Sequence, residues 1–218
     1  MNPKFKNFAV LFVLFVLPLI FYVLVSSGVN NFARLPVLTA HISPVQTLDS
    51  TSTLQFENNI TMVCFLGNNP EQNTGGIFNL NQKIYKPFYG FKDFQIIVVA
   101  PLGSEAVVAN IKTSLGAFTN MHKWHFVYAD TPAIDAFYKS FQSPIPFDAY
   151  GYNSHAFIVD KDSSLRGRTD DEDTADGLLF GYNMHAVATL NNKMKDDVKV
   201  LLAEYRLALK KNNADREI

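Results

Sequence analysis

The stretch ITMVCFLGNNPEQNTGGI, residues 60–77, decides the fold of this chain. Its first seven residues form an apolar run bounded by turn residues, which predicts a short buried strand. The segment after it repeats apolar residues at helical spacing, namely Ile77, Leu80, Ile84 and Phe88, which predicts an amphipathic helix that starts near Gly76. Between the two lies the loop Asn69-Pro70-Glu71-Gln72-Asn73, which contains no cysteine.

The alternation of strand and helix continues along the rest of the chain. Further strands are predicted at Phe94–Ala100, Trp124–Ala129 and His155–Val159, with a first strand at Pro44–Leu48 and a hairpin through Leu165–Arg168. Further helices are predicted at 107–118, 134–141 and 191–211. The order β-α-β-α-β-α-β-β-α predicts an α/β domain with a central mixed sheet flanked by helices, and its terminal hairpin followed by a helix is typical of a thioredoxin-like domain.

The N-terminus predicts a transmembrane helix. Lys4 and Lys6 precede Phe8–Val25, an almost unbroken apolar run of about 18 residues without charge, which is enough to span a bilayer. The lysines predict a cytoplasmic N-terminus, so we expect a single-pass protein of an inner or plasma membrane, its C-terminal domain extracytoplasmic and, in a bacterium, periplasmic. A cleaved signal peptide is the alternative, because small residues follow at Ser26–Gly28, but the run exceeds the usual 7 to 15 residues.

These patterns divide the chain into the N-terminus and anchor at 1–27, a linker at 28–44, one domain at 45–212 and a flexible tail at 213–218. The formal net charge is -1, so the chain lacks the basic excess on which nucleic-acid binding relies. Cys64 is the single cysteine, so an internal disulfide is excluded. Because Cys64 lies within the strand of residues 60–66, we expect it to act as a small buried apolar residue.

A stretch late in the chain, His155-Ala-Phe-Ile-Val-Asp-Lys-Asp162 followed by Leu165-Arg-Gly-Arg168, resembles the SCO (SenC) family of membrane-anchored, thioredoxin-like proteins. These residues are similar to the family's strand, Asp-containing turn and Arg-Gly segment before a C-terminal helix. Ser163 stands where the family often has a turn glycine. The resemblance covers most of residues 45–212, and it implies an association with copper delivery and thiol chemistry during cytochrome c oxidase assembly.

The resemblance also implies where the family's site would lie. The family binds metal through a Cys-Pro-x-x-Cys loop after the first core strand and a histidine before the late strand. Aligned on Pro70, the loop of this chain has Asn69 and Asn73 at the two cysteine positions, and Tyr152 falls near the histidine position. Amides supply neither a thiolate for Cu(I) nor an attacking thiol, so we expect no cofactor and no thiol-disulfide enzyme activity.

Other side chains of this chain could carry chemistry. A copper chaperone with atypical ligands, His155 with His122 or His125, is the alternative, although His155 falls three residues after Tyr152 and so on the opposite face of the strand. A third functional hypothesis is a thiol reductase that acts through Cys64.

Two further groups are better explained by structure than by chemistry. We interpret the acidic run 170–173 as a solvated loop, and we expect Glu71 not to be catalytic, because no nucleophile with a nearby histidine accompanies it. The aromatic residues between Tyr85 and Phe94 are numerous enough to extend past the core into a partner surface. The leading hypothesis is a non-catalytic membrane protein that acts through protein contacts, in respiratory oxidase assembly or another membrane complex.

Overall fold

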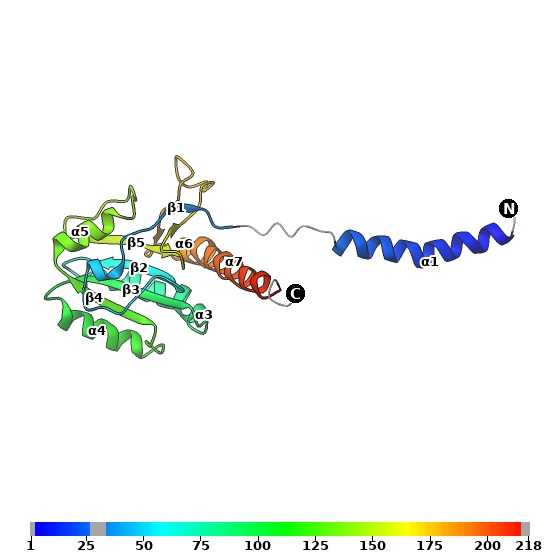
Figure 1. The fold of residues 1–218 in the computed structure, drawn as a ribbon. Coiled ribbons are helices and arrows are strands. Elements are labelled where there is room, and N and C mark those ends of the chain that lie inside the picture. The colour runs from blue at the N-terminus through cyan, green and yellow to red at the C-terminus, as the bar shows by residue number, and fades with distance from the viewer. Residues whose placement is uncertain (1–2, 27–33, 215–218) are drawn as a thin grey trace. The chain divides into compact units, whose positions relative to one another are not determined.

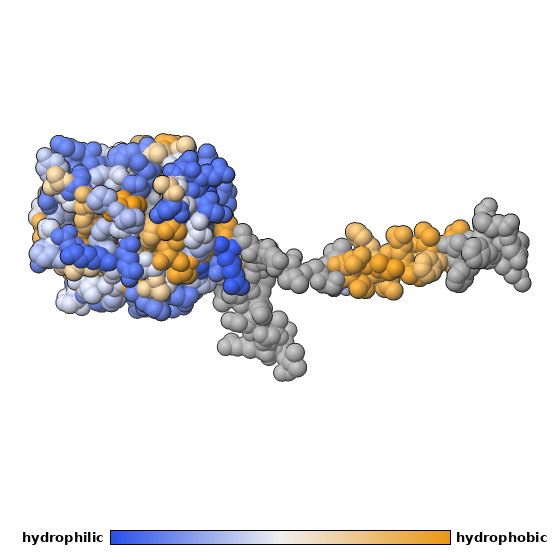
Figure 2. Space-filling model, turned by 90° about the horizontal axis from the view of Figure 1, so that it is seen from above, coloured by the Kyte–Doolittle hydropathy of each residue, from blue (hydrophilic) through white to orange (hydrophobic). Residues whose placement is uncertain are grey.

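The computed structural model describes the backbone of residues 3–26 and 34–214 and the side chains of residues 10–24 and 34–206. The chain divides into two units, residues 1–33 and residues 34–218. The first unit is the helix α1 (Pro3–Ser26), whose described side chains form a continuous apolar surface (Figure 2). Among the described residues, no helix meets the length and apolarity needed to cross a membrane.

The second unit is built on a mixed sheet with the strand order β1-β6-β5-β2-β3-β4, and β7 pairs with β5 beside this path. The parallel strands are β2 (Ile60–Leu66), β3 (Phe94–Pro101) and β4 (Trp124–Ala129). The antiparallel strands are β1 (Val37–Thr39), β5 (Tyr152–Val159), β6 (Leu165–Arg166) and β7 (Tyr182–Asn183). A parallel βαβ unit completed by an antiparallel hairpin and a helix confirms the predicted thioredoxin-like α/β fold.

Helices cover both faces of the sheet (Figure 1). One face, here called the α2 face, packs against α2 (Thr74–Leu80), η2 (Asn81–Tyr85), α3 (Lys86–Phe88), α4 (Glu105–Gly116), η3 (Leu190–Met194) and α7 (Lys195–Ala214). The other, the α5 face, packs against η1 (Val45–Thr47) and α5 (Thr131–Lys139). The short helix α6 (Val187–Thr189) leads into η3.

Burial on both faces explains the continuous apolar runs of the central strands. Every residue of β2 is buried, with Cys64 in the core of the α2 face and Phe65 in the core of the α5 face. A strand covered on one side only would show alternation of apolar and polar residues, whereas a strand covered on both sides is apolar throughout.

The hairpin of β5 and β6 is closed by the predicted Asp-containing turn. Asp160 is buried, and its Oδ1 accepts backbone hydrogen bonds from Asp162 and Ser164 at 2.9 and 2.8 Å. Its Oδ2 accepts a hydrogen bond from Arg166 at 2.6 Å, and Arg166 also pairs with Glu204 of α7 at 3.0 Å. This buried ion network joins the hairpin to the C-terminal helix.

The predicted linker and first strand are wrong. The linker was placed at 28–44, but Val37–Thr39 forms β1 and pairs with β6, and Leu35 and Ile42 are buried. The segment 45–47, predicted as part of a strand, forms the 3-10 helix η1 instead. Residues 28–33 of the linker and 215–218 of the predicted tail lie outside the described residues, while 213–214 continue α7.

Candidate functional site

The loop between β2 and α2 is fixed by the segment that precedes β5. Gly67 has a φ of +64°, and a Cβ atom on it would lie 2.6 Å from the backbone nitrogen of Tyr152 and 2.7 Å from the carbonyl oxygen of Tyr150. The next residue, Asn68, donates its backbone N–H to the same Tyr150 carbonyl at 2.8 Å. Only glycine fits this close approach, so the loop and the start of β5 form one rigid structure.

The two asparagines that the sequence resemblance aligns with cysteines, Asn69 and Asn73, lie in this loop. Successive turns form it, with the N–H of Gln72 bound to the carbonyl of Asn69 and the N–H of Asn73 bound to the carbonyl of Pro70, both at 3.2 Å. Pro70 is buried, and the side-chain amide of Asn73 donates to the carbonyl of Leu66 at 3.3 Å. The Asn73 side chain therefore closes the end of β2, a structural role.

Tyr152 forms a side-chain pair with His185, which lies 33 residues later in the sequence. The Tyr152 hydroxyl lies 2.8 Å from Nε2 of His185, and the two rings are 6.1 Å apart at 69°. A Cβ atom on Gly76 would lie 3.2 Å from that hydroxyl and 3.5 Å from Nε2, so the first turn of α2 packs directly against the pair. Tyr152 is buried and His185 is exposed, so the histidine shields the phenol from solvent.

Cys64 lies in the core beneath this pair. It is fully buried on the α2 face, in the same apolar cluster as Tyr152. Burial raises the pKa of the Cys64 thiol strongly. Burial also raises the pKa of the Tyr152 phenol, and nearby Cys64 and Asp148 raise it further. Both groups are held neutral at physiological pH, so neither provides an anionic nucleophile or metal ligand there.

The structure does not bring together the histidines of the alternative copper site. His155 lies on β5 and His125 on β4, and β2 and β3 separate these strands. Three strand spacings amount to about 14 Å, whereas ligands of one ion lie within about 4 Å of one another. His122 lies just before β4, beside Tyr89 at a ring distance of 6.2 Å. No group of three or more potential metal ligands occurs in the part of the chain that the structure describes.

His155 also lies on the other face of β5 from Tyr152. Tyr152 packs in the core of the α2 face, and the neighbouring Asn153 contacts Tyr138 on the α5 face, where the side-chain amide of Asn153 donates to the hydroxyl of Tyr138 at 3.0 Å. Residues 153 and 155 share a face of an extended strand. Burial lowers the pKa of His155, as it does that of His125, so both are neutral at pH 7.

The acidic run 170–173 is not entirely a solvated loop. Asp171 is buried, and Lys193 of η3 donates to both of its carboxylate oxygens at 2.7 Å and to Asp173 at 2.6 Å. The neighbouring Asp170 and Glu172 are exposed. The run therefore contains a structural ion pair that holds the loop after β6 against the C-terminal helices.

Glu71 is exposed and lines a pocket of about 240 Å³ with the rest of its loop and Val107.

The aromatic residues between Tyr85 and Phe94 divide into two groups. Tyr85, Phe88 and Phe94 are buried, whereas Tyr89 and Phe91 are 39% and 48% exposed. The predicted extension of this group past the core is therefore limited to two side chains.

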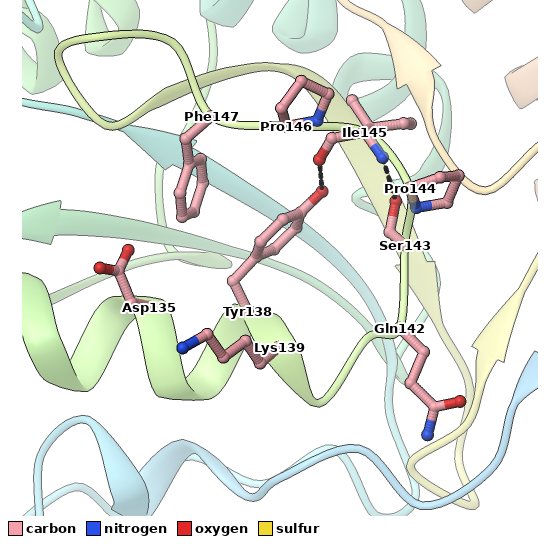
Figure 3. Close-up of a pocket in the computed structure, with 9 residues that line it drawn as sticks. All are labelled: Asp135, Tyr138, Lys139, Gln142, Ser143, Pro144, Ile145, Pro146 and Phe147. Carbon is pink, nitrogen blue, oxygen red and sulfur yellow. Dashed lines mark hydrogen bonds between the residues drawn. The ribbon is translucent and has the colours of Figure 1, made fainter.

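A second pocket, of about 350 Å³, lies on the α5 face, between α5 and the segment 142–147 (Figure 3). Tyr138 lines the pocket, and its hydroxyl donates to the carbonyl of Ile145 at 2.5 Å. Asp135 and Lys139 add a carboxylate and an ammonium group to its lining. The pocket and the Tyr152–His185 pair thus lie on opposite faces of the sheet.

These residues do not fit the copper ion that the family resemblance implies. Cu(I) selects thiolate and thioether ligands. The two loop positions carry amides, the third is a neutral phenol paired with His185, and the one thiol is buried. What the arrangement offers is a surface formed by the loop, the exposed Gly75 in the first turn of α2 and the imidazole of His185.

No family model matches the chain, and no curated protein matches its sequence. Solved structures do resemble it. BsSco, a member of the Sco family of cytochrome c oxidase assembly proteins, is 14% identical with a TM-score of 0.49 over 77% of this chain and 97% of that one. A thiol:disulfide interchange protein of the thioredoxin family from Chlorobium tepidum is 14% identical, with a TM-score of 0.42 over 80% and 99%. The thioredoxin domain of a thiol-disulfide oxidoreductase from Bacteroides vulgatus is 14% identical, with a TM-score of 0.40 over 78% and 98%. At these identities the likeness concerns the fold alone.

Proposed function

We propose that this chain is a membrane-anchored, extracytoplasmic SCO-like protein that acts through protein contacts rather than through thiol or copper chemistry. Its partner is a component of respiratory oxidase assembly or of another membrane complex in the same envelope. The observation that carries the proposal is the Tyr152–His185 hydrogen bond, in which the residue that the resemblance aligns with the family's third ligand is already engaged. The asparagines at the cysteine positions support it, since the thioredoxin-like frame is kept while its reactive groups are replaced.

The support for the proposed membrane anchor comes from the sequence. The run Phe8–Val25 carries no charge, and two lysines precede it. Protease added to intact cells or spheroplasts should remove the domain and leave a protected N-terminal fragment. Full protection of the chain would contradict the proposed extracytoplasmic location.

Cu(I) titration of the purified full-length chain tests the loss of metal chemistry. We expect no stoichiometric binding under conditions in which a control protein with a Cys-Pro-x-x-Cys loop binds one equivalent. Stoichiometric binding that disappears in His185→Ala or His155→Ala, and persists in the exposed control His41→Ala, would overturn the proposal.

Photo-cross-linking in native membranes tests the contact surface. A photoreactive residue at Gln72, in the exposed part of the loop, should give one discrete adduct with an envelope protein. The same residue at Ser114, which is exposed on α4, is the matched control and should give none. Equal adducts at both positions, or none at Gln72, would show that the loop is not the contact surface.

A further inference from the structure

Strand β4 lies at the edge of the sheet, and its outer side is unpaired within residues 34–206. The carbonyls of Lys123 and Ala129 accept from Ile96 and Leu102, so these two residues direct their backbone groups toward β3. Because this direction alternates along a strand, the N–H and C=O groups of Phe126 and Tyr128 point away from β3. No described residue hydrogen-bonds to them on that side.

The sequence of β4 does not protect this edge. Natural edge strands carry lysine, proline or a bulge that prevents pairing with another chain. Trp124–Ala129 contains no charged residue, no proline and no glycine, and its register against β3 is continuous. Such a six-residue segment with aromatic and β-branched residues is a good template for a further strand.

We propose that β4 pairs antiparallel with β4 of a second copy of this chain, about a two-fold axis at Phe126. The two sheets then continue into one. The inference does not depend on the proposed function, because it concerns the far edge of the sheet rather than the loop after β2.

The side chains of β4 are self-complementary in this register. Phe126 lies opposite Phe126 of the partner subunit, and Trp124 lies opposite the partner's Tyr128. The N–H and C=O groups of Phe126 face outward, so the central Phe126 pair can exchange two hydrogen bonds. The N–H of Trp124 already donates to the carbonyl of Met121 at 3.0 Å, so each outer pair can form one bond, from the N–H of Tyr128 to the carbonyl of the partner's Trp124. Cross-strand aromatic pairs are among the favourable ones in antiparallel sheets. Trp124 and Phe126 already stack at 6.2 Å and 20° within one subunit, which places the aromatic rings on one face.

The residues that flank the strand add charge complementarity. In the same register, the exposed carboxylate of Asp130 lies opposite the exposed imidazole of the partner's His122. The two-fold axis creates this arrangement twice. A second copy supplies both the aromatic and the charged complement from one sequence, as a two-fold interface requires, and this is why we name it as the occupant.

Sedimentation velocity of the full-length chain in mild detergent tests the proposal. We expect a dimer whose population rises between about 1 and 100 μM, the range of a weak specific interface. Phe126→Lys places two lysines opposite each other and should raise the dissociation constant at least tenfold. Phe118→Lys removes a 60% exposed ring elsewhere on the surface and should leave the dimer unchanged. A monomer at 100 μM, or a dimer insensitive to Phe126→Lys, would overturn the proposal.

Cysteine cross-linking tests the register independently of whether Phe126→Lys folds. The two copies of residue 126 should lie about 5.5 Å apart between Cα atoms, within disulfide range, so Phe126→Cys should form a covalent dimer on mild oxidation. Tyr128→Cys is the matched control on the same face, since its two copies would lie about 13 Å apart. Buried Cys64 gives no background. Equal cross-linking of both variants, or none of Phe126→Cys, would exclude the register.

Discussion

Gly67 determines how closely the site loop approaches β5. In Gly67→Ala the new Cβ would fall within 3 Å of backbone atoms at 150–152 and the residue would keep a positive φ, so we expect the free energy of unfolding to fall by about 3 kcal/mol. Gly75→Ala is the matched control, because nothing lies within 4 Å of its Cβ position and alanine favours a helix by up to about 1 kcal/mol. Urea unfolding measures the free energy of unfolding of both variants. A Gly67→Ala protein as stable as Gly75→Ala would mean that the close approach costs nothing.

Ser163 occupies the turn position where the resembling family often has glycine, and its φ is +58°. An L-residue in this region carries a steric cost that glycine avoids, so Ser163→Gly should raise the free energy of unfolding by about 1 kcal/mol. The hydrogen bond lost is long, 3.3 Å from Oγ to Glu57, and exposed. Ser114→Gly, in the exposed part of α4, should instead lower the stability by about 0.5 kcal/mol. The same sign for both variants would contradict the argument from φ.

The sequence predicted part of the site and could not have predicted the rest. Asn69, Asn73 and Tyr152 lie on the loop and strand that a family resemblance aligns, and the close contact of Gly67 with residues 150–152 brings these segments together. His185 follows β7, 33 residues after Tyr152, and no spacing connects the two. Only the pairing of β7 with β5 brings the imidazole to the phenol.

At the scale of elements, the long central strands were predictable because burial on both faces makes them continuously apolar. Strand β4 was predicted with its observed bounds, Trp124–Ala129, and β2 as well. Strands β1 and β7 have only three and two residues, too few to show a period. They are stabilised by pairing with strands far along the chain, β1 with β6 and β7 with β5, and such non-local pairing leaves no local pattern.

The ion pair between Asp171, in the loop after β6, and Lys193 of η3 should make the free energy of unfolding depend on pH. Burial alone would raise the pKa of Asp171, but hydrogen bonds from Lys193 and the backbone of Asp173 outweigh it, and the net pKa is lowered. The stabilisation is therefore complete above the unfolded pKa, near 3.9, and is lost as pH falls through the lower folded pKa. Asp171→Asn should be less stable at pH 7 and lose less stability below about pH 4 than the wild-type protein.

Urea unfolding from pH 2 to 7 measures this dependence. Asp170→Asn is the matched control, since Asp170 is exposed and no described residue forms an ion pair with it. It should follow the wild-type curve. An acid dependence that is the same in Asp171→Asn and in the wild-type protein would show that other carboxylates control it.

At the scale of the whole molecule, the sheet with helices on both faces makes Cys64 a reporter of global unfolding. Cys64 is fully buried in β2, the central strand that pairs with both β3 and β5, and burial raises the pKa of its thiol. A thiol reagent can reach it only when this strand leaves the sheet, so labelling of the native protein should be slow and limited by the population of the open state.

The labelling rate should therefore follow the stabilities of the variants above. A loss of about 3 kcal/mol corresponds to an open population about 160-fold larger, so Gly67→Ala should be labelled more than 100-fold faster than the wild-type protein. Ser163→Gly should be labelled about fivefold more slowly, because 1 kcal/mol corresponds to that factor. A rate that is fast in the wild-type protein and independent of these substitutions would mean that Cys64 is reached through a local opening at the site loop. Thiol chemistry through Cys64 would then replace protein contact as the function best supported.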